Sequence, residues 1–236
     1  MPTKRTYGDR CGIARALDLV GERWALLVVR ELLLGPKRFT DLRSGLPHVS
    51  PDVLSQRLRE LEEAGIVRRG KLPPPAGSRI YELTERGHQL EPVVLELGRF
   101  GSVAPFPPGE AEIGVDALAI ALKTLFAPDA AEGLDATYEL RLGEDRFRVR
   151  VADGRLDIAR GSADAPDATI DADPGALATV LWHGAKLAAA RRAGDVTASG
   201  DAQAVRRFLA LFPLPGSAGS DGRPAGGRSP AGTRGR

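Results

Sequence analysis

The chain has a single cysteine, no long apolar run and no apolar leader, and each shortage excludes a class of protein. With Cys11 alone, neither an intramolecular disulfide nor a cysteine-based zinc cluster can form. Charged residues interrupt the apolar runs within one or two helical turns, far short of the ~20 residues that span a bilayer. The first residues also lack the apolar stretch of a signal peptide. We therefore expect a cytoplasmic protein that does not bind membranes.

Signs of catalysis are missing as well. The histidines His48, His88 and His183 are scattered, with no acidic or histidine partner at the spacing of metal ligands. The sequence has no glycine loop for phosphate, no serine elbow and no paired carboxylate motif. We therefore predict no enzyme activity, no metal and no cofactor.

The length of 236 residues favours two domains, because single domains usually have roughly 100 to 200 residues. Hydrophobic residues make up 42% and charged residues 27%, which is typical of a globular protein. The charge is divided along the chain: residues 1–104 have a net charge of +4, residues 105–215 of −5 and residues 216–236 of +3. This division suggests that only the front of the chain meets a polyanion.

Proline and glycine mark the domain boundary. The stretch 105–109 holds three prolines and a glycine, and it can continue neither a helix nor a sheet. We predict a first domain at 1–104, a linker at 105–110 and a second domain at 111–215. Residues 216–236 are almost entirely Gly, Ser, Pro, Ala and Arg, so we predict a disordered basic tail.

The spacing of apolar residues predicts a series of helices in the first domain. Helical spacing covers residues 11–20 and again 22–34, where Gly35-Pro36 ends the second helix. Thr40 is expected to cap a short helix that Gly45 closes. A final helix is predicted to start at Thr84, with apolar residues through Phe100.

A stronger local signal opens the helix at 51–64. Ser50 can accept the exposed amides of its first turn, and Pro51 stands where no amide is needed. The side chains predicted to face the core are Val53, Leu54, Leu58 and Leu61. Short basic strands at 66–69 and 79–83 follow. This order of helices and a basic hairpin predicts a winged helix-turn-helix, in which a helix N-terminus enters the major groove of double-stranded DNA.

The outer face of this helix and the hairpin have suitable chemistry for DNA. Gln56 can bond to an adenine edge and Arg59 to guanine or phosphate, while the serines can bond to either. Basic hairpin residues can neutralise backbone charge without setting a sequence preference. The alternative is a helix face that is merely solvated. The predicted DNA contacts are Arg38, Thr40, Ser50, Pro51, Asp52, Ser55, Gln56, Arg59, Arg68, Arg69, Lys71 and Arg79.

A succession of short motifs runs through this domain in order. They are Cys11, ALDLVG (16–21), RW (23–24), REL (30–32), GP (35–36), RF (38–39), DL (41–42), LSQRL (54–58), LE (61–62), GIV (65–67) and YELT (81–84). In these motifs the chain resembles the HxlR family of bacterial regulators, relatives of the MarR-type winged-helix proteins. The resemblance implies a homodimer built through the first and last helices and an operator with inverted half-sites. Members often have basic residues directly after the cap serine, where this chain has Pro51 and Asp52.

Cys11 lies where the family's cysteine lies, and some relatives use that thiol to sense electrophiles or oxidants. Sensing requires a thiolate, which a helix N-terminus and nearby cations such as Arg10 and Arg15 would favour. The alternative is a small buried apolar group.

The second domain is predicted to be α+β, with a sheet covered on one face by helices. A helix is expected at 115–126, alternating strands at 138–151, further strands near Leu156 and Ile170, and a helix that Asp173 caps. Two more helices are expected near 186–193 and 201–212. The motifs YEL (138–140), ATI (168–170), DP (173–174), residues 187–194 and SGD (199–201) resemble the sterol-carrier-like domain.

That resemblance implies an apolar tunnel and a hydrophobic small-molecule effector that changes the spacing of the DNA-reading modules. The candidate lining residues are Leu122, Phe126, Tyr138, Trp182, Phe208 and Phe212. Each is more simply a core residue, and the domain could serve only dimerisation or stability. A further alternative for the whole chain is a lipid carrier whose winged helix contacts proteins.

Overall fold

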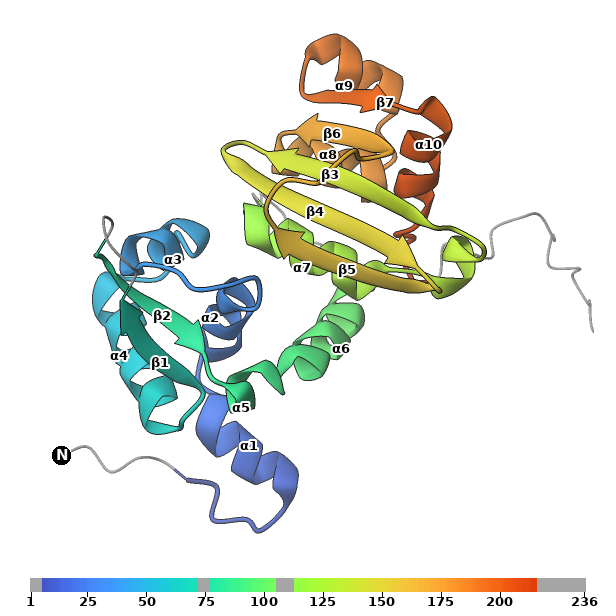
Figure 1. Ribbon diagram of the computed structural model, residues 1–236. Coiled ribbons are helices and arrows are strands. Elements are labelled where there is room, and N and C mark those ends of the chain that lie inside the picture. The colour runs from blue at the N-terminus through green and yellow to red at the C-terminus, as the bar shows by residue number, and fades with distance from the viewer. Residues whose placement is uncertain (1–5, 72–76, 105–112, 216–236) are drawn as a thin grey trace, which may run out of the picture.

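The computed structural model describes residues 6–71, 77–104 and 113–215. It consists of a helical N-terminal body with a β-hairpin, and a C-terminal body in which helices cover a sheet (Figure 1). The α+β class and the winged-helix front predicted from the sequence are confirmed. The predicted linker and tail fall outside the described residues, and the domain boundaries stay a prediction.

The N-terminal body holds the elements expected of a winged helix-turn-helix. They are α1 (Gly12–Val20), α2 (Ala25–Leu32), α3 (Phe39–Gly45), α4 (Pro51–Glu63), β1 (Val67–Lys71), β2 (Arg79–Leu83), α5 (Glu85–His88) and α6 (Glu91–Ser102). The strands β1 and β2 pair antiparallel, and Lys37 forms a short bridge to Tyr81 beside them. The hairpin therefore has a third backbone segment along part of one edge.

Two predicted helix starts were wrong, and the final helix is shorter than predicted. The second helix begins at Ala25, because Trp24 has a left-handed backbone with φ of 77°. Thr40 lies inside α3, and the amide of Arg38 before the helix donates to Asp41 at 3.0 Å. The final helix is split, because Thr84 caps only the single turn of α5 and a new helix starts at Glu91.

The first core lies among α2, α4 and the hairpin. Leu54, Leu58 and Leu61 of α4 are buried as predicted. Val53 was predicted to face the core and is 39% exposed instead. It precedes Leu54 by one residue, so it points about 100° away from the buried stripe on the helix.

The C-terminal body is built on a five-stranded sheet of order β5-β4-β3-β6-β7. Its elements are α7 (Val115–Leu125), a 3-10 turn (Pro128–Ala131), β3 (Ala136–Leu142), β4 (Asp145–Ala152), β5 (Arg155–Arg160), β6 (Ala168–Ala172), α8 (Pro174–Trp182), α9 (Leu187–Ala193), β7 (Val196–Gly200) and α10 (Ala202–Ala210). The strands β3 and β6 are parallel, and the other neighbours are antiparallel.

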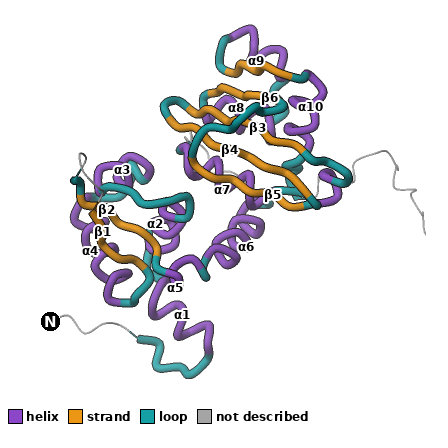
Figure 2. Tube along the Cα trace, viewed as in Figure 1, coloured by secondary structure: helices purple, strands orange, loops and turns teal. Residues whose placement is uncertain are grey.

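Alternating residues decide which face of this sheet is covered. On β4, Phe147, Val149 and Val151 are buried and the arginines between them are more exposed. Helices α7, α8 and α10 gather on one face, as Figures 1 and 2 show. Asp173 caps α8 as predicted, accepting the amide of Ala176 at 3.0 Å. The sequence analysis placed no strand at β7.

Helix α7 packs against both bodies. Its Leu118 and Leu122 lie in the C-terminal core, while Ile120 lies in the N-terminal core. It also approaches α6 closely: a Cβ added at Gly98 would lie 2.9 Å from the methyl group of Thr124. None of the helices in the described ranges is long and apolar enough to cross a membrane.

Candidate nucleic-acid interface

The first turn of α4 is open to solvent. The hydroxyl of Ser50 accepts the amide of Val53 at 3.4 Å, which confirms the predicted cap. Ser50, Pro51 and Asp52 are exposed, and Ser55 is half-buried. The exposed amides of a helix start favour anions, so this turn is suited to a phosphate or a base edge.

One turn further on, the two predicted base-reading side chains touch each other. Arg59 donates from Nη2 to Oε1 of Gln56 at 2.6 Å, and Gln56 donates from Nε2 to Glu60 at 2.7 Å. Both Gln56 and Arg59 are exposed. These bonds use only part of the hydrogen-bonding capacity of the guanidinium and the amide, so both side chains can also bond to another partner.

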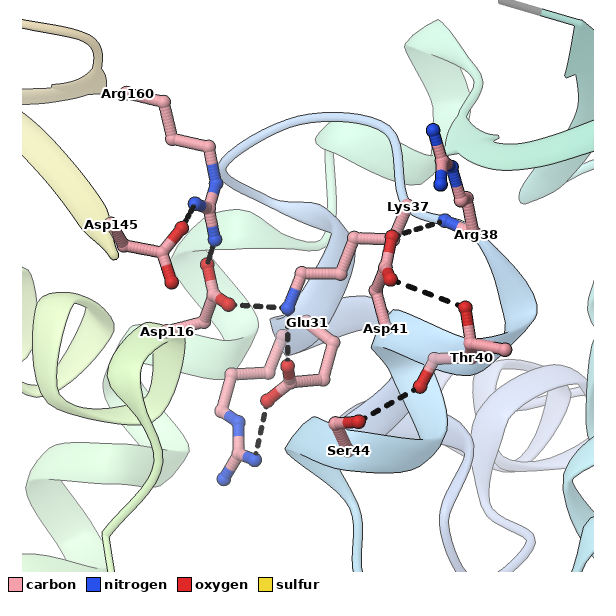
Figure 3. Close-up of polar contacts among 10 residues, drawn as sticks. Glu31, Lys37, Arg38, Thr40, Asp41, Ser44, Asp116, Asp145 and Arg160 are labelled. Carbon is pink, nitrogen blue, oxygen red and sulfur yellow. Dashed lines mark hydrogen bonds and ion pairs between the residues drawn. The ribbon is translucent and has the colours of Figure 1, made fainter. Parts of the chain in front are cut away.

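The predicted contacts on α3 are exposed as well. Thr40 donates from its hydroxyl to Asp41 at 3.2 Å, and Asp41 also accepts the amide of Arg38 (Figure 3). This leaves the guanidinium of Arg38 at the start of α3 as an exposed positive charge.

Two basic residues of the hairpin form ion pairs with acidic residues, and two others face each other. Arg68 bonds to Glu82 at 2.9 Å and Arg69 to Glu62 at 3.1 Å, both at exposed sites. Lys71 lies directly opposite Arg79, and neither has an acidic partner among the described residues. Like charges opposite each other on a hairpin repel, so an anion bound there would relieve the repulsion. The predicted wing residues 72–76 lie outside the described residues.

Cys11 is exposed and immediately precedes α1. Its amide donates to Asp9 at 2.9 Å. The preceding segment folds back onto α1, since the amide of Tyr7 donates to Asp18 at 3.0 Å. The thiol is therefore an accessible group, not a small apolar filler of the core.

Exposed apolar side chains gather on the helices that the sequence analysis assigned to dimerisation. On α1, Ile13 is 72% and Leu17 is 42% exposed. On α6, Val93, Leu97 and Phe100 are between 51% and 78% exposed. In the described residues, every exposed large apolar side chain lies between Tyr7 and Val103. Such apolar surface on two helices of one body is typical of an interface.

The predicted lining residues of the C-terminal domain meet in its core. The rings of Tyr138 and Phe208 are 5.1 Å apart, those of Phe208 and Phe212 5.2 Å, and those of Phe126 and Phe212 6.4 Å. Trp182 donates from its indole to the carbonyl of Phe212 at 3.0 Å. Leu122 is fully buried in the same cluster.

The hydroxyl of Tyr138 stands out in this cluster. The side chain is fully buried, and its oxygen has no hydrogen-bond partner among the described residues. Burial raises the pKa of the phenol, with Asp167 adding to the effect. Buried polar atoms normally have a partner, so this oxygen is suited to a water or to a polar group of a ligand.

The sequence analysis missed a set of ion pairs between the two bodies, buried at Glu31, Lys37 and Asp116 (Figure 3). The ammonium of Lys37 bonds to Glu31 at 2.6 Å and also to Asp116 of α7. Asp116 accepts Nη2 of Arg160 at 2.6 Å, and Arg160 also bonds to Asp145. No local pattern indicates these pairs, because Lys37 and Asp116 are 79 residues apart in the chain. The described residues hold no cluster of acidic, histidine or cysteine side chains suited to a metal.

Comparison with known proteins matches the two bodies separately. Residues 19–104 match the HxlR-like helix-turn-helix family, and residues 111–217 match the family described as alkyl sulfatase C-terminal. The second match confirms a distinct C-terminal domain. The matched family is described as alkyl sulfatase C-terminal, whereas the sequence analysis noted a resemblance to the sterol-carrier-like domain.

Individual relatives match the N-terminal part. The uncharacterized HTH-type transcriptional regulator YvaP of Bacillus subtilis is 38% identical over 88 residues, 37% of this chain and 82% of YvaP. The HTH-type transcriptional regulator YodB of the same organism is 42% identical over 82 residues, 35% of this chain and 73% of YodB. A solved structure of the redox regulator HypR in its oxidized form is 33% identical, with a TM-score of 0.39, and the match covers 41% of this chain and all of HypR.

Proposed function

The chain belongs to the HxlR-like helix-turn-helix family, whose matched relatives are transcriptional regulators, and from that premise we propose that it binds a specific operator in double-stranded DNA as a homodimer. The first turn of α4 enters the major groove, where Gln56 and Arg59 read base edges. Arg38, Thr40 and Ser50 contact the flanking backbone, and the hairpin lies along the adjacent phosphates.

One observation carries this proposal more than any other. The N-terminal body holds both the open first turn of α4 and the opposed pair of Lys71 and Arg79, which have no acidic partner among the described residues. A merely solvated helix face would not need a cationic pair on the neighbouring hairpin. Arg68 and Arg69 add charge to the same hairpin.

The homodimer is proposed from the apolar faces of α1 and α6. The side chains of Ile13, Leu97 and Phe100 are exposed to water, and burying them against a second copy would be favourable. Such a dimer would contain two α4 helices. An operator with two inverted half-sites follows from the two-fold symmetry of such a dimer.

Salt dependence of binding tests the DNA proposal. Affinity for the promoter fragment beside the protein's own gene is measured by fluorescence anisotropy across a series of salt concentrations. If the protein contacts phosphates, affinity falls steeply with salt, with a log–log slope of about −0.9 for each phosphate contact. Arg79→Gln and Lys71→Gln should each reduce that slope by about 1.

The matched control is Lys186→Gln, which removes an exposed positive charge from the C-terminal body. It should leave the slope unchanged. Binding that is absent at low ionic strength, or that does not respond to salt, would reject the proposal and favour a carrier that uses its N-terminal body for protein contacts.

We further propose that the C-terminal domain takes a hydrophobic effector with one polar group, which the hydroxyl of Tyr138 would bind. The support is the phenol oxygen, which has no hydrogen-bond partner within the described ranges and lies in the aromatic cluster of Phe126, Phe208 and Phe212. Titration with a fluorescent fatty acid should give saturable binding, and Tyr138→Phe should weaken it by about tenfold, the effect of one lost buried hydrogen bond. Equal binding by wild type and variant would reject Tyr138 as the anchor.

Cys11 is proposed as a second input, because its thiol is exposed beside the apolar face of α1. Alkylation there would add bulk where the second copy is expected to pack. Treatment with N-ethylmaleimide should therefore change DNA affinity in the wild type and leave Cys11→Ser unaffected. An equal response of both proteins would exclude this role.

A further inference from the structure

Six charged side chains form an alternating chain between the two bodies. Arg30, Glu31 and Lys37 come from the N-terminal body, and the C-terminal side supplies Asp116, Arg160 and Asp145 (Figure 3). The first half therefore has one excess positive charge and the second half one excess negative charge. The two bodies have complementary charge at their contact, and each half is incomplete without the other.

The centre of this chain is shielded from water. Glu31 is 1%, Asp116 4% and Lys37 8% exposed. Attraction between such groups is stronger than at the surface, because little solvent screens them. Glu31 also fills the space that a side chain at Gly45 would occupy, so the end of α3 packs around the same cluster.

Lys37 is bonded through both its backbone and its side chain. Its backbone amide donates to the carbonyl of Tyr81 at 2.9 Å, and its carbonyl accepts the amide of Tyr81 at 2.8 Å. Its ammonium binds Asp116 of α7. One residue thus joins the edge of the hairpin to the C-terminal body.

Tyr81 carries this link to a predicted DNA contact. It lies directly opposite Arg69 in the hairpin, and the guanidinium of Arg69 lies 5.8 Å from the centre of the Tyr81 ring. The contacts therefore run without a break from Asp116 through Lys37 and Tyr81 to Arg69. Packed side chains and ion pairs of this kind can carry energetic coupling between distant sites.

We propose that Lys37 is a positioning residue through which the C-terminal domain fixes the hairpin. The pairing of Lys37 with Asp116 holds the segment before α3 against β2, and loss of that pairing loosens the hairpin. A change in the C-terminal domain that moves α7 would therefore alter the order of the hairpin, even where the C-terminal domain itself does not contact DNA. Only the last arm of the test below rests on the proposed function.

The test is the exchange of the Tyr81 amide with solvent, measured by NMR in the full chain without DNA. Asp116→Asn removes one charge from α7 and leaves every residue of the N-terminal body unchanged. The Tyr81 amide should then exchange about tenfold faster, because the opening of its bond to Lys37 is less costly. Asp157→Asn is the matched control: this exposed aspartate of β5 pairs with Arg148 at 3.5 Å, away from the chain of charges.

A second variant covers the case in which Asp116→Asn does not fold. Arg160→Gln changes a side chain that is 32% exposed and removes one partner of Asp116. It should speed exchange at Tyr81 in the same direction and to a smaller extent. Exchange within about twofold of the wild type and of Asp157→Asn, in every variant that folds, overturns the proposal.

The DNA arm separates this inference from the proposed function. If both hold, Asp116→Asn also weakens binding to operator and random duplex alike, because the hairpin contacts phosphates. If the wild type ignores DNA but Tyr81 still exchanges faster in Asp116→Asn, the proposed function fails and the positioning role stands. If DNA binding is steep in salt and exchange at Tyr81 is unchanged, the positioning role fails alone.

Discussion

The guanidinium of Arg59 donates to the side-chain oxygen of Gln56 at 2.6 Å on the exposed face of α4. The same bond orients the amide of Gln56, whose nitrogen donates to Glu60. Each side chain therefore orients the other, and each keeps hydrogen-bonding groups for a further partner.

We predict that Gln56→Ala and Arg59→Ala each weaken specific binding by about 1 to 3 kcal/mol. Because the two side chains share a bond, the double variant should lose less than the sum of the single losses. Gel-shift titration with operator and random duplex measures both effects, and Gln89→Ala, an exposed glutamine after α5, is the control. Unchanged shifts for both single variants would mean that another face reads the bases.

In contrast, Arg79→Ala should weaken binding to every sequence to a similar extent. Its position opposite Lys71 in the hairpin suits a phosphate contact, which carries no base preference. The ratio of operator to random-duplex affinity should therefore stay constant while both affinities fall. A selective loss on the operator alone would assign Arg79 to base reading instead.

The apolar face of α6 predicts the effect of charge on assembly. Leu97→Asp combined with Phe100→Asp should halve the mass seen in sedimentation equilibrium, because two charges would have to be buried between the copies. Ala188→Asp, at an exposed site of α9, should leave the mass unchanged. A wild type that sediments as a monomer, or a double variant that stays dimeric, would contradict the proposed interface.

Two glycines of α6 offer a matched test of its packing on α7. Nothing lies within 4 Å of a Cβ added at Gly101, so Gly101→Ala should stabilise the protein by up to about 1 kcal/mol through helix propensity. Gly98→Ala should instead destabilise it by about 1 to 3 kcal/mol, because the new methyl group overlaps Thr124.

In a Thr124→Ala background that overlap disappears, and Gly98→Ala should then become stabilising. Thermal unfolding of the wild type, Gly98→Ala, Thr124→Ala and the double variant measures the sign of each change in stability. A stabilising Gly98→Ala in the wild-type background would show that α6 and α7 separate easily.

Glu139 predicts how stability depends on pH. The backbone amide of Ala163 and the guanidinium of Arg141 bond to this carboxylate and lower its pKa below the ordinary 4.5. Its stabilising effect is complete above about pH 4.5 and is lost as the pH falls through the folded pKa, because the unfolded chain takes up the proton first.

Glu139→Gln should therefore lower the melting temperature at neutral pH and flatten its fall in acid. Glu144→Gln, at an exposed turn position, should follow the wild-type curve. If the melting temperatures of the wild type and Glu139→Gln fall in parallel with pH, Glu139 does not cause the loss of stability in acid.

Prediction from the sequence succeeded where the cause is local. The cap at Ser50 and the cap at Asp173 each depend on one side chain and the next turn of the helix. The alternation on β4 likewise matches the burial of its side chains, whereas on β3 Glu139, expected on the outer face, is 3% exposed. These features fixed the α+β class and the candidate reading helix.

Prediction failed where the cause is distant or depends on backbone strain. No residue near Trp24 in the sequence indicates its left-handed conformation. Likewise, no residue near Val53 indicates that its side chain is exposed to solvent. Lys37 and Asp116 look like ordinary surface charges until the fold brings them together. The helix and hairpin that carry the candidate contacts could therefore be predicted, and the contact between Lys37 and Asp116 could not.

Helix α7 follows the predicted linker in sequence, yet its Ile120 completes the core of the body before it. A protein cut after residue 104 would thus lose Ile120, a residue that packs in the core of its N-terminal body. Grafting the C-terminal domain onto an HxlR-like relative would require transferring α7 together with the surfaces of α2 and α6 that receive it. Helix α7 therefore lies within the C-terminal match in sequence, while its side chains pack in both cores.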